Sequence, residues 1–477
     1  MWRWLRMLNN LIRDKGRKGR RGYALPRFDV ERVALEKVLP KQTLRKEKPG
    51  LPEVDEPTVV RHYTNLSRKN WGIDTNFYPL GSCTMKHNPR ANEAAAAVPG
   101  FAGLHPLHPE EGAQGALQVM REAQGFLSEI SGFPAVALQP MAGAQGELTS
   151  ILMIKRYFED VGDDGRTTVL VPESAHGTNP ATATMAGFGS REIETDEDGC
   201  VDVDELREKV DASTAALMIT NPNTCGVYEK NIEEIAEILH EAGAFLYMDG
   251  ANMNANVGRV RPAEAGVDVM HYNLHKTFST PHGGGGPGSG AIACSETLAP
   301  FRPDPVVEKG GEGYRFVRPE KSIGRVAGFH GNFGQVLRAW NYIKMHGPEL
   351  KENTDMAVLN ANYIRARLRG TYRIPFDGLC KHEVIVQPPK GKKALDVAKG
   401  LIDHGYHPPT IYFPLIVKEA MLIEPTETES KETLDDFIGT MLELAESSPE
   451  DLQEAPVNAP TKRLDEARAA RRLKAHW

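Results

Sequence analysis

The chain has 477 residues, a formal net charge of −7 and 40% hydrophobic residues, a composition that suits a soluble globular protein with a large core. No apolar run approaches the roughly 18 residues of a membrane span, and the mild acidity gives no reason to expect a nucleic-acid partner. The five cysteines are scattered and form no CxxC pair, which argues against a disulfide framework and a zinc site. We therefore expect no membrane, no metal and a cytoplasmic location.

The N-terminal region is first basic and then rich in proline and charge. No apolar stretch of roughly 7–15 residues follows the basic residues between positions 3 and 21, which excludes a secretory signal peptide. A solvated basic arm is the simplest interpretation; an organellar presequence and a start at Met7 are alternatives. Because residues 22–90 show little periodicity, we interpret residues 1–90 as an extended arm that lies across another surface.

A regular alternation of helices and strands begins after residue 110. Leu117, Met120, Leu127 and Ile130 recur at helical spacing and predict a helix that ends near Gly132. Beyond it, short apolar runs bounded by turn residues predict strands. The predicted strands cover 136–138, 168–171, 215–219, 244–248, 267–274 and 291–293, and the predicted helices between them cover 147–159 and 232–240.

This alternation predicts βαβ units, and therefore an α/β fold with a mostly parallel sheet flanked by helices. We assign residues 91–330 to this large domain and residues 331–370 to connecting helices. A smaller α+β domain is expected over 371–455, with strands at 383–387 and 410–413 and helices at 393–404 and 431–447. A charged tail, 456–477, ends the chain.

Three residues that follow predicted strands are candidates for chemistry. Lys276 follows an apolar run and precedes Gly283–Gly286, so its amine would be desolvated yet reachable, as a Schiff-base lysine must be. Asp249 ends another apolar strand, where a buried carboxylate needs a partner. His176 lies just past a strand, where its ring can stack on a ligand. The alternatives are a surface lysine, an aspartate that caps a turn and a solvated loop histidine.

The segment Gly143-Ala144-Gln145-Gly146 lies between an apolar run and a helix. Small residues let backbone N–H groups approach an anion, and a helix N-terminus favours negative charge. The segment is therefore a candidate phosphate-binding turn. It lacks both the GxGxxG spacing of dinucleotide-binding folds and the Gly-Lys-Ser/Thr end of a P-loop.

The order of these features is more specific than any one of them. A phosphate turn, a ring-stacking histidine, the turn at Asn221-Pro222, an aspartate and then a lysine followed by glycines is the order of sites in fold-type-I enzymes that use pyridoxal 5'-phosphate (PLP). In those enzymes the aspartate keeps the ring nitrogen protonated, so that the ring absorbs a carbanion's electrons. The sequence therefore predicts this class. His275, next to Lys276, joins the expected cofactor-binding residues.

Several longer motifs resemble the glycine decarboxylase P-protein family of the glycine cleavage system. They extend over most of the chain and comprise Phe77–Lys86, Gln139–Glu147, Ser174–Pro180, Asp249–Asn254, Asn273–Phe278 and Glu424–Ser430. The chain is similar to the C-terminal, cofactor-binding half of the longer P-protein, as found in organisms that split it into two subunits. The resemblance implies that Lys276 forms the Schiff base with PLP and that Asp249 pairs with the ring nitrogen. It further implies that His176 stacks on the ring and that Gly143, Ala144 and Gln145 hold the phosphate.

The resemblance also implies the reaction and the partners. Glycine would lose its carboxylate as CO₂, and the remaining aminomethyl group would pass to the lipoyl arm of the H-protein. Because the lipoyl disulfide is reduced in that step, the enzyme would formally be an oxidoreductase. Glycine decarboxylase subunit 1 would complete a heterotetramer, and the loop Tyr78–Lys86 would help to shape the substrate site.

Two other functions stay open on the residues alone. The stretch Asn221–Gly226 is also typical of aminotransferases, so another fold-type-I activity, such as transamination or hydroxymethyl transfer to folate, is an alternative. A non-catalytic scaffold subunit is the second. A bound cofactor would exclude the scaffold, and a requirement for a 2-oxoacid would favour the aminotransferase.

Overall fold

The computed structural model describes residues 11–47, 49–282, 288–311 and 313–473, so the predicted glycine run Gly283–Gly286 lies outside the described residues. The chain divides into two compact units, one ending at Gly72 and the other beginning at Ile73. Residues 73–90, which the sequence placed in the arm, thus belong to the second unit. Among the described residues, no helix is both long enough and apolar enough to cross a membrane.

The first unit contains little regular structure. Its described residues form the α-helices α2 (Leu35–Val38) and α3 (Glu56–Ser67) and the short 3₁₀ helices Ile12–Lys15 and Lys41–Thr43. Asp55 caps α3 by accepting a hydrogen bond from the Thr58 amide at 2.9 Å. None of the helices described in this unit has a buried residue. The unit therefore lacks an apolar core within its described residues.

The second unit is built on a sheet of seven described strands in the order β1-β7-β6-β5-β4-β2-β3. The pairings from β6 through β5, β4 and β2 to β3 are parallel, and β7 runs antiparallel to both β1 and β6. The prediction of a mostly parallel sheet is confirmed. The strands are β1 (Ala135–Ala137), β2 (Thr168–Pro172), β3 (Gly189–Ile193), β4 (Thr214–Thr220), β5 (Phe245–Gly250), β6 (Val269–Tyr272) and β7 (Ile292–Cys294).

Helices cover both faces of this sheet, because its central strands are apolar on both sides. In β4, Leu217 and Ile219 join one core with α6 (Gln114–Ser131), α10 (Ile232–Glu241) and α12 (Phe333–His346). Ala216 and Met218 face the other core, with α7 (Gly143–Val161) and α8 (Thr178–Met185). The remaining elements of this part are α4 (Arg90–Ala96), α5 (Pro99–Ala102), α9 (Val203–Lys209), α11 (Leu274–Thr277), β8 (Val306–Lys309), β9 (Tyr314–Val317) and the 3₁₀ helices Glu110–Gly112, Met253–Ala255, Pro262–Ala265 and Ala299–Phe301.

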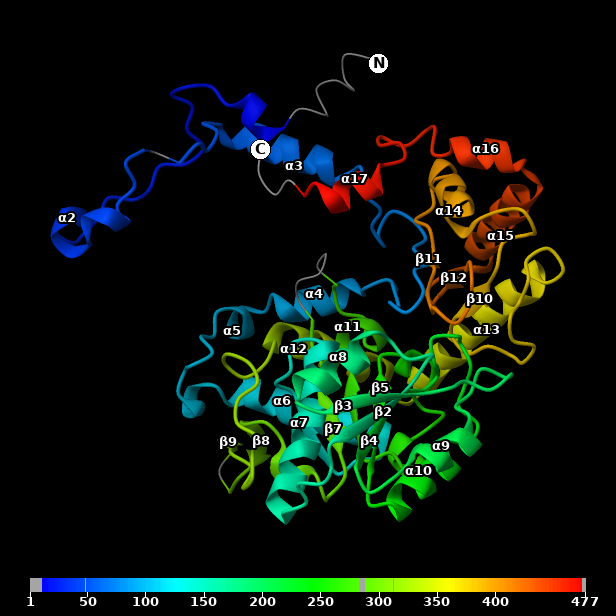
Figure 1. The fold of residues 1–477 in the computed structure, drawn as a ribbon. Helices are drawn as coiled ribbons and strands as arrows, with labels where there is room; N and C mark the ends of the chain where they lie inside the picture. The colour runs from blue at the N-terminus through cyan, green and yellow to red at the C-terminus, as the bar shows by residue number, and fades with distance from the viewer. Residues whose placement is uncertain (1–10, 48, 283–287, 312, 474–477) are drawn as a thin grey trace. The chain divides into compact units, whose positions relative to one another are not determined.

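The C-terminal part of this unit, where the sequence predicts a smaller α+β domain, holds an antiparallel sheet in the order β10-β12-β11 (Figure 1). Its helices α13, α14 and α15 pack on this sheet around Phe437, Leu401 and Ile364. The elements are α13 (Leu350–Leu368), β10 (Val384–Val386), α14 (Ala394–Asp403), β11 (Thr410–Ile411), β12 (Met421–Ile423), α15 (Lys431–Glu446), α16 (Pro449–Glu454) and the exposed α17 (Glu466–Arg471). The 3₁₀ helix Gly347–Glu349 separates α12, which packs in the large core, from α13.

Some strands were missing from the sequence prediction. Strand β3 lies at the edge of the large sheet and is mostly exposed, so its polar residues show no apolar run. The predicted strand 267–274 is too long, because Asn273 leaves the sheet and begins a helical turn closed by the hydrogen bond from the Lys276 amide to the Asn273 carbonyl (2.9 Å). Lys276 therefore lies in α11, not at the end of a strand.

Candidate active site

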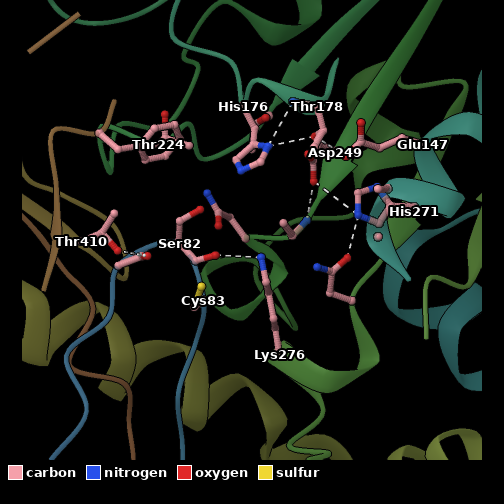
Figure 2. Close-up of a pocket in the computed structure, with 18 of the residues that line it drawn as sticks. Ser82, Cys83, Glu147, His176, Thr178, Thr224, Asp249, His271, Lys276 and Thr410 are labelled. Carbon is pink, nitrogen blue, oxygen red and sulfur yellow. Dashed lines mark hydrogen bonds and ion pairs between the residues drawn. The ribbon is translucent and has the colours of Figure 1, made fainter. Parts of the chain in front are cut away.

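A cavity of about 410 Å³ opens at the carboxyl edge of the large sheet, where ligands of open parallel sheets bind (Figure 2). Strands β4 and β5, helices α7 and α11, and the segment after β2 all contribute side chains. Residues from two distant stretches, Leu80–Cys83 and Thr410–Phe413, close it. Its lining comprises Leu80, Gly81, Ser82, Cys83, Gly143, Ala144, Glu147, His176, Thr178, Thr220, Thr224, Asp249, Ala251, Asn252, His271, Asn273, Lys276, Thr410 and Phe413.

Lys276 projects into this cavity from α11 (Figure 2). Its Nζ donates a hydrogen bond of 2.8 Å to the carbonyl oxygen of Ser82. The side chain is half-buried, so its amine is reachable from the cavity. A lysine in this position can act as a nucleophile towards a carbonyl group in the cavity.

Asp249 is 3% exposed at the end of β5, and Oδ1 accepts a hydrogen bond of 2.8 Å from the Ala251 amide. The parallel register places it beside His271 of β6, whose Nε2 lies 3.5 Å from the carboxylate. His271 Nε2 also lies 2.7 Å from Asn273 Oδ1, which can only accept, so the ring hydrogen is on Nε2. Tyr247 then donates to Nδ1 at 2.7 Å. This network fixes the position of a buried carboxyl group at the base of the cavity.

His176 stands at the mouth of the cavity, and its Nδ1 accepts a hydrogen bond of 3.2 Å from the Thr178 amide. The Thr178 hydroxyl donates to Glu147 at 2.8 Å. Glu147 also accepts from Asn179 (3.0 Å) and Thr182 (3.1 Å), so one buried carboxylate holds the whole start of α8. Burial, with Asp249 nearby, raises the pKa of Glu147. The sequence had assigned no role to Glu147 or His271, although each is a titratable residue among apolar neighbours.

The predicted phosphate turn forms the N-terminus of α7, and Gly143 and Ala144 line the cavity. A Cβ on Gly143 would overlap the side chain of Asn273, so this packing requires glycine. Gln145 is not among the lining residues: its Oε1 accepts from the Met141 amide at 2.7 Å, and its amide group donates to the Val326 carbonyl. Gln145 instead fixes the turn that leads into the helix.

His275 is likewise not among the lining residues. Its Nδ1 accepts a hydrogen bond of 3.3 Å from the Ser289 amide, and its ring packs edge-on against His282. Burial lowers the pKa of His275 to about 3 and that of His282 to about 4, so both rings are neutral at physiological pH. His275 therefore supports the segment beside Lys276 without adding charge.

These groups fit PLP as a ligand. An amine faces the cavity, a carboxylate lies at its base, and a helix N-terminus offers N–H groups to an anion. Thr220 lines the cavity, and its buried Oγ1 has no hydrogen-bond partner among the described residues, which leaves a donor for a ligand. An aldehyde on an aromatic ring that carries a phosphate matches all of these features.

Comparisons with known proteins agree with this class. The family model "Aminotransferase class-V" matches residues 146–323. A crystal structure of the glycine decarboxylase P-protein of the glycine cleavage system, in inhibitor-bound form, shares the fold with a TM-score of 0.74 at 22% identity, over 86% of this chain and 95% of that one. A sphingosine-1-phosphate lyase from Burkholderia pseudomallei gives 0.62 at 15% identity, over 90% and 94% of the two chains. The chain thus has the fold of the fold-type-I PLP-dependent enzymes.

Sequence relatives define the family. A probable glycine dehydrogenase (decarboxylating) subunit 2 from Alkaliphilus oremlandii is 51% identical over 478 residues, 98% of each chain. The protein of the same name from Halalkalibacterium halodurans is 54% identical over 472 residues, 97% of this chain and 96% of its own. The family model "Glycine dehydrogenase, C-terminal domain" matches residues 353–467. The chain belongs to the glycine dehydrogenase (decarboxylating) subunit 2 family, which confirms the resemblance in the sequence motifs.

Proposed function

We propose that this chain is the PLP-binding, catalytic subunit of a glycine decarboxylase, with the cofactor attached to Lys276. The observation that carries the proposal is the convergence of Lys276, Asp249 and the α7 N-terminus on one cavity at the carboxyl edge of the sheet. Each comes from a different βα unit, and each has the chemistry that one part of PLP requires. The names of the relatives supply the substrate, glycine.

The side chains around the cavity then have separate tasks. Bound PLP supplies an electron-withdrawing ring that stabilises negative charge at the α-carbon once glycine's carboxylate leaves. Asp249 would hold a proton on the ring nitrogen, and His176 would stack on the ring. The N–H groups at Gly143 and Ala144 would bind the phosphate, while Gln145 and His275 hold the segments that carry these contacts. The Lys276 amine donates to Ser82 O in the ligand-free chain, and with glycine bound this amine would be positioned to move protons.

The proposed reaction ends with transfer to a second protein. The aminomethyl group passes to the lipoyl arm of an H-protein, whose disulfide is reduced in the same step, while CO₂ carries away the carboxylate carbon. The substrate itself has no side chain, so the residues of Leu80–Cys83 would need to bind only its carboxylate and to leave room for the lipoyl arm. The proposed location of this reaction is the cytoplasm.

The exposed surface of the N-terminal unit is an argument for a partner subunit. Several of its large apolar side chains are more than half exposed, which is costly unless another surface covers them: Tyr23, Leu25, Phe28, Val30, Val33, Leu35, Val38, Leu51, Val60 and Tyr63. We propose that glycine decarboxylase subunit 1 covers this segment in a heterotetramer, since the relatives are named subunit 2. An obligate interface of this kind buries about 2,000 Å² or more.

The pure chain is therefore expected to bind PLP but to decarboxylate glycine only after subunit 1 is added. The measurement is isotope exchange between bicarbonate and the glycine carboxyl, with PLP and lipoylated H-protein, before and after addition of subunit 1. Full exchange by the pure chain would contradict the need for a partner. A reaction that instead requires a 2-oxoacid would contradict the proposed function.

His176→Ala is expected to weaken PLP binding and to lower the exchange rate, each by roughly ten-fold, because the stacked ring is lost. His176→Phe is the matched control, since it keeps an aromatic face without the imidazole. It should bind PLP more tightly than the alanine variant does. Fluorescence titration of the cofactor-free proteins gives the PLP affinities. Equal affinities of the wild type and both variants would show that His176 does not contact the cofactor.

A further inference from the structure

Residues 80–87, here called the strap, connect the small sheet with the active site. Leu80 forms an isolated antiparallel bridge with Ile423 of β12, and the Gly81 amide donates to the Leu422 carbonyl at 3.2 Å. A Cβ on Gly81 would overlap that carbonyl group, so only glycine allows this approach. At its other end, Lys86 donates to the Thr277 carbonyl, one residue after Lys276 in α11 (2.6 Å).

The middle of the strap has a costly backbone conformation. Ser82 and Thr84 have φ angles of 66° and 41°, in the left-handed region that residues other than glycine rarely adopt. Such strain persists only where the surrounding structure holds it. Two carboxylates from the small domain do so: Glu383 accepts from the Ser82 amide at 2.8 Å, and Glu424 accepts from the Thr84 amide at 2.9 Å.

These two carboxylates form a buried pair. Glu383 and Glu424 are both 0% exposed, and each has a second oxygen, Oε1, without a hydrogen-bond partner among the described residues. One atom from each of Glu383, Glu424 and the buried His382 lies within 4.8 Å of the others. Two adjacent negative charges that are both buried are strongly unfavourable, so such a pair retains a proton.

The direction of the pKa shifts agrees with this geometry. Burial raises the pKa of Glu424 to about 7, and burial together with Glu424 raises the pKa of Glu383 well above its usual range. The pair therefore binds the strap while carrying less than its full negative charge near neutral pH. Other titratable groups interact with this region: Cys83, Lys86, Cys225, Lys276, His282, Cys380, His382 and Glu427.

We propose that Glu383 and Glu424 are positioning residues for Lys276, acting through the strap. They hold Ser82 and Thr84 in the left-handed conformation, and Ser82 thereby presents its carbonyl oxygen to the Lys276 amine at 2.8 Å (Figure 2). The carboxyl pair thus sets where the amine stands when it is not bonded to the cofactor. This inference rests on the proposed attachment of PLP to Lys276.

The test uses the full-length chain carrying Glu383→Ala, Glu383→Gln, Glu424→Ala or Glu424→Gln. A glutamine keeps the acceptor for the strap amide, and its NH₂ group replaces the retained proton as the donor within the pair. Glu229→Ala is the matched control, because Glu229 is also buried (1% exposed) and also accepts backbone hydrogen bonds, from Val201 and Asn231, but does not contact the strap. The Glu229→Ala variant shows how far general destabilisation of the chain slows PLP attachment.

Two readouts are needed. Hydrogen exchange of the cofactor-free chain reports directly on the Ser82 and Thr84 amides. The rate constant for PLP attachment to Lys276, followed by visible absorbance, reports on the position of the amine. Both alanine variants are expected to lose protection in the peptide covering residues 80–87 and to attach PLP at least about ten-fold more slowly than the wild type. The glutamine variants and Glu229→Ala should stay within about two-fold of the wild-type rate.

The possible results separate this inference from the proposed function. Glutamine variants that attach PLP as slowly as the alanine variants would overturn the inference. The negative charge of the two carboxylates would then be required, as it would be for binding a cation, and their hydrogen bonds to the strap would not explain the effect. Equal slowing by Glu229→Ala would also overturn it, since the effect would be general. Failure of PLP to attach to Lys276 in the wild type would instead refute the proposed function, while the exchange of the strap amides would still test how the pair holds the strap.

Discussion

Alanine in place of Lys276 is expected to lower glycine–bicarbonate exchange by at least about 10³-fold, because no other described side chain in the cavity offers an amine to the cofactor. The fold should persist. Among the described residues, the Lys276 side chain hydrogen-bonds to the Ser82 carbonyl from a half-buried position at the cavity wall, so its removal leaves no buried charge.

The measurement combines the exchange assay with thermal unfolding of the variant. Lys155→Ala is the matched control: that lysine also donates to a backbone carbonyl, Ala186 O at 2.8 Å, but lies outside the cavity lining. It should keep wild-type exchange. A Lys276→Ala protein that unfolds at the wild-type temperature and still exchanges at more than about a tenth of the wild-type rate would refute the assignment.

Asp249→Asn has the second-largest expected effect, a loss of roughly 10²- to 10³-fold in turnover with a much smaller loss of PLP affinity. An asparagine keeps an oxygen for the Ala251 amide, so the turn after β5 is retained. It cannot hold a proton on the ring nitrogen, and the ring then stabilises negative charge poorly. The effect should therefore fall on kcat and not on the amount of bound cofactor.

Asp268→Asn is the control for this variant. Asp268 also accepts from a backbone amide, that of Leu246 (2.7 Å), and lies 2.9 Å from a histidine, His240, but at the start of β6, the opposite end from His271. The Asp268→Asn variant shows how much turnover falls when a hydrogen-bonded carboxylate outside the cavity is lost. If Asp249→Asn turned over at the Asp268→Asn rate, Asp249 would serve only to cap its turn.

Much of the site was predictable from the sequence, because parallel strands bring their carboxyl ends to one edge. The apolar runs before Asp249 and Lys276 marked two neighbouring strands, and the structure places both residues on one cavity. The small residues Gly143 and Ala144 marked the helix N-terminus in the same way, since a helix that follows a strand starts at that edge.

The remaining parts of the site depend on tertiary structure. His271 contacts Asp249 because of the register between β5 and β6, which no single-strand pattern encodes. Glu383 and Glu424 reach the strap from positions 301 and 340 residues away in sequence. Glu383 precedes β10 and Glu424 follows β12, the central strand of the small sheet, which was not predicted. In the sequence, the motif that begins at Glu424 was recognisable only through its resemblance to the family. The hydrogen bond that Glu424 accepts from the Thr84 amide gives a physical reason for a glutamate at this position.

Borohydride reduction of the PLP-loaded chain, followed by peptide mapping, tests the central claim most directly. Borohydride reduces a carbon–nitrogen double bond between the cofactor's aldehyde and a lysine, and so fixes the label in place. The account predicts stoichiometric label on the peptide that contains Lys276. Label on another lysine, such as the buried Lys86 that contacts Glu427 at 2.7 Å, would contradict it.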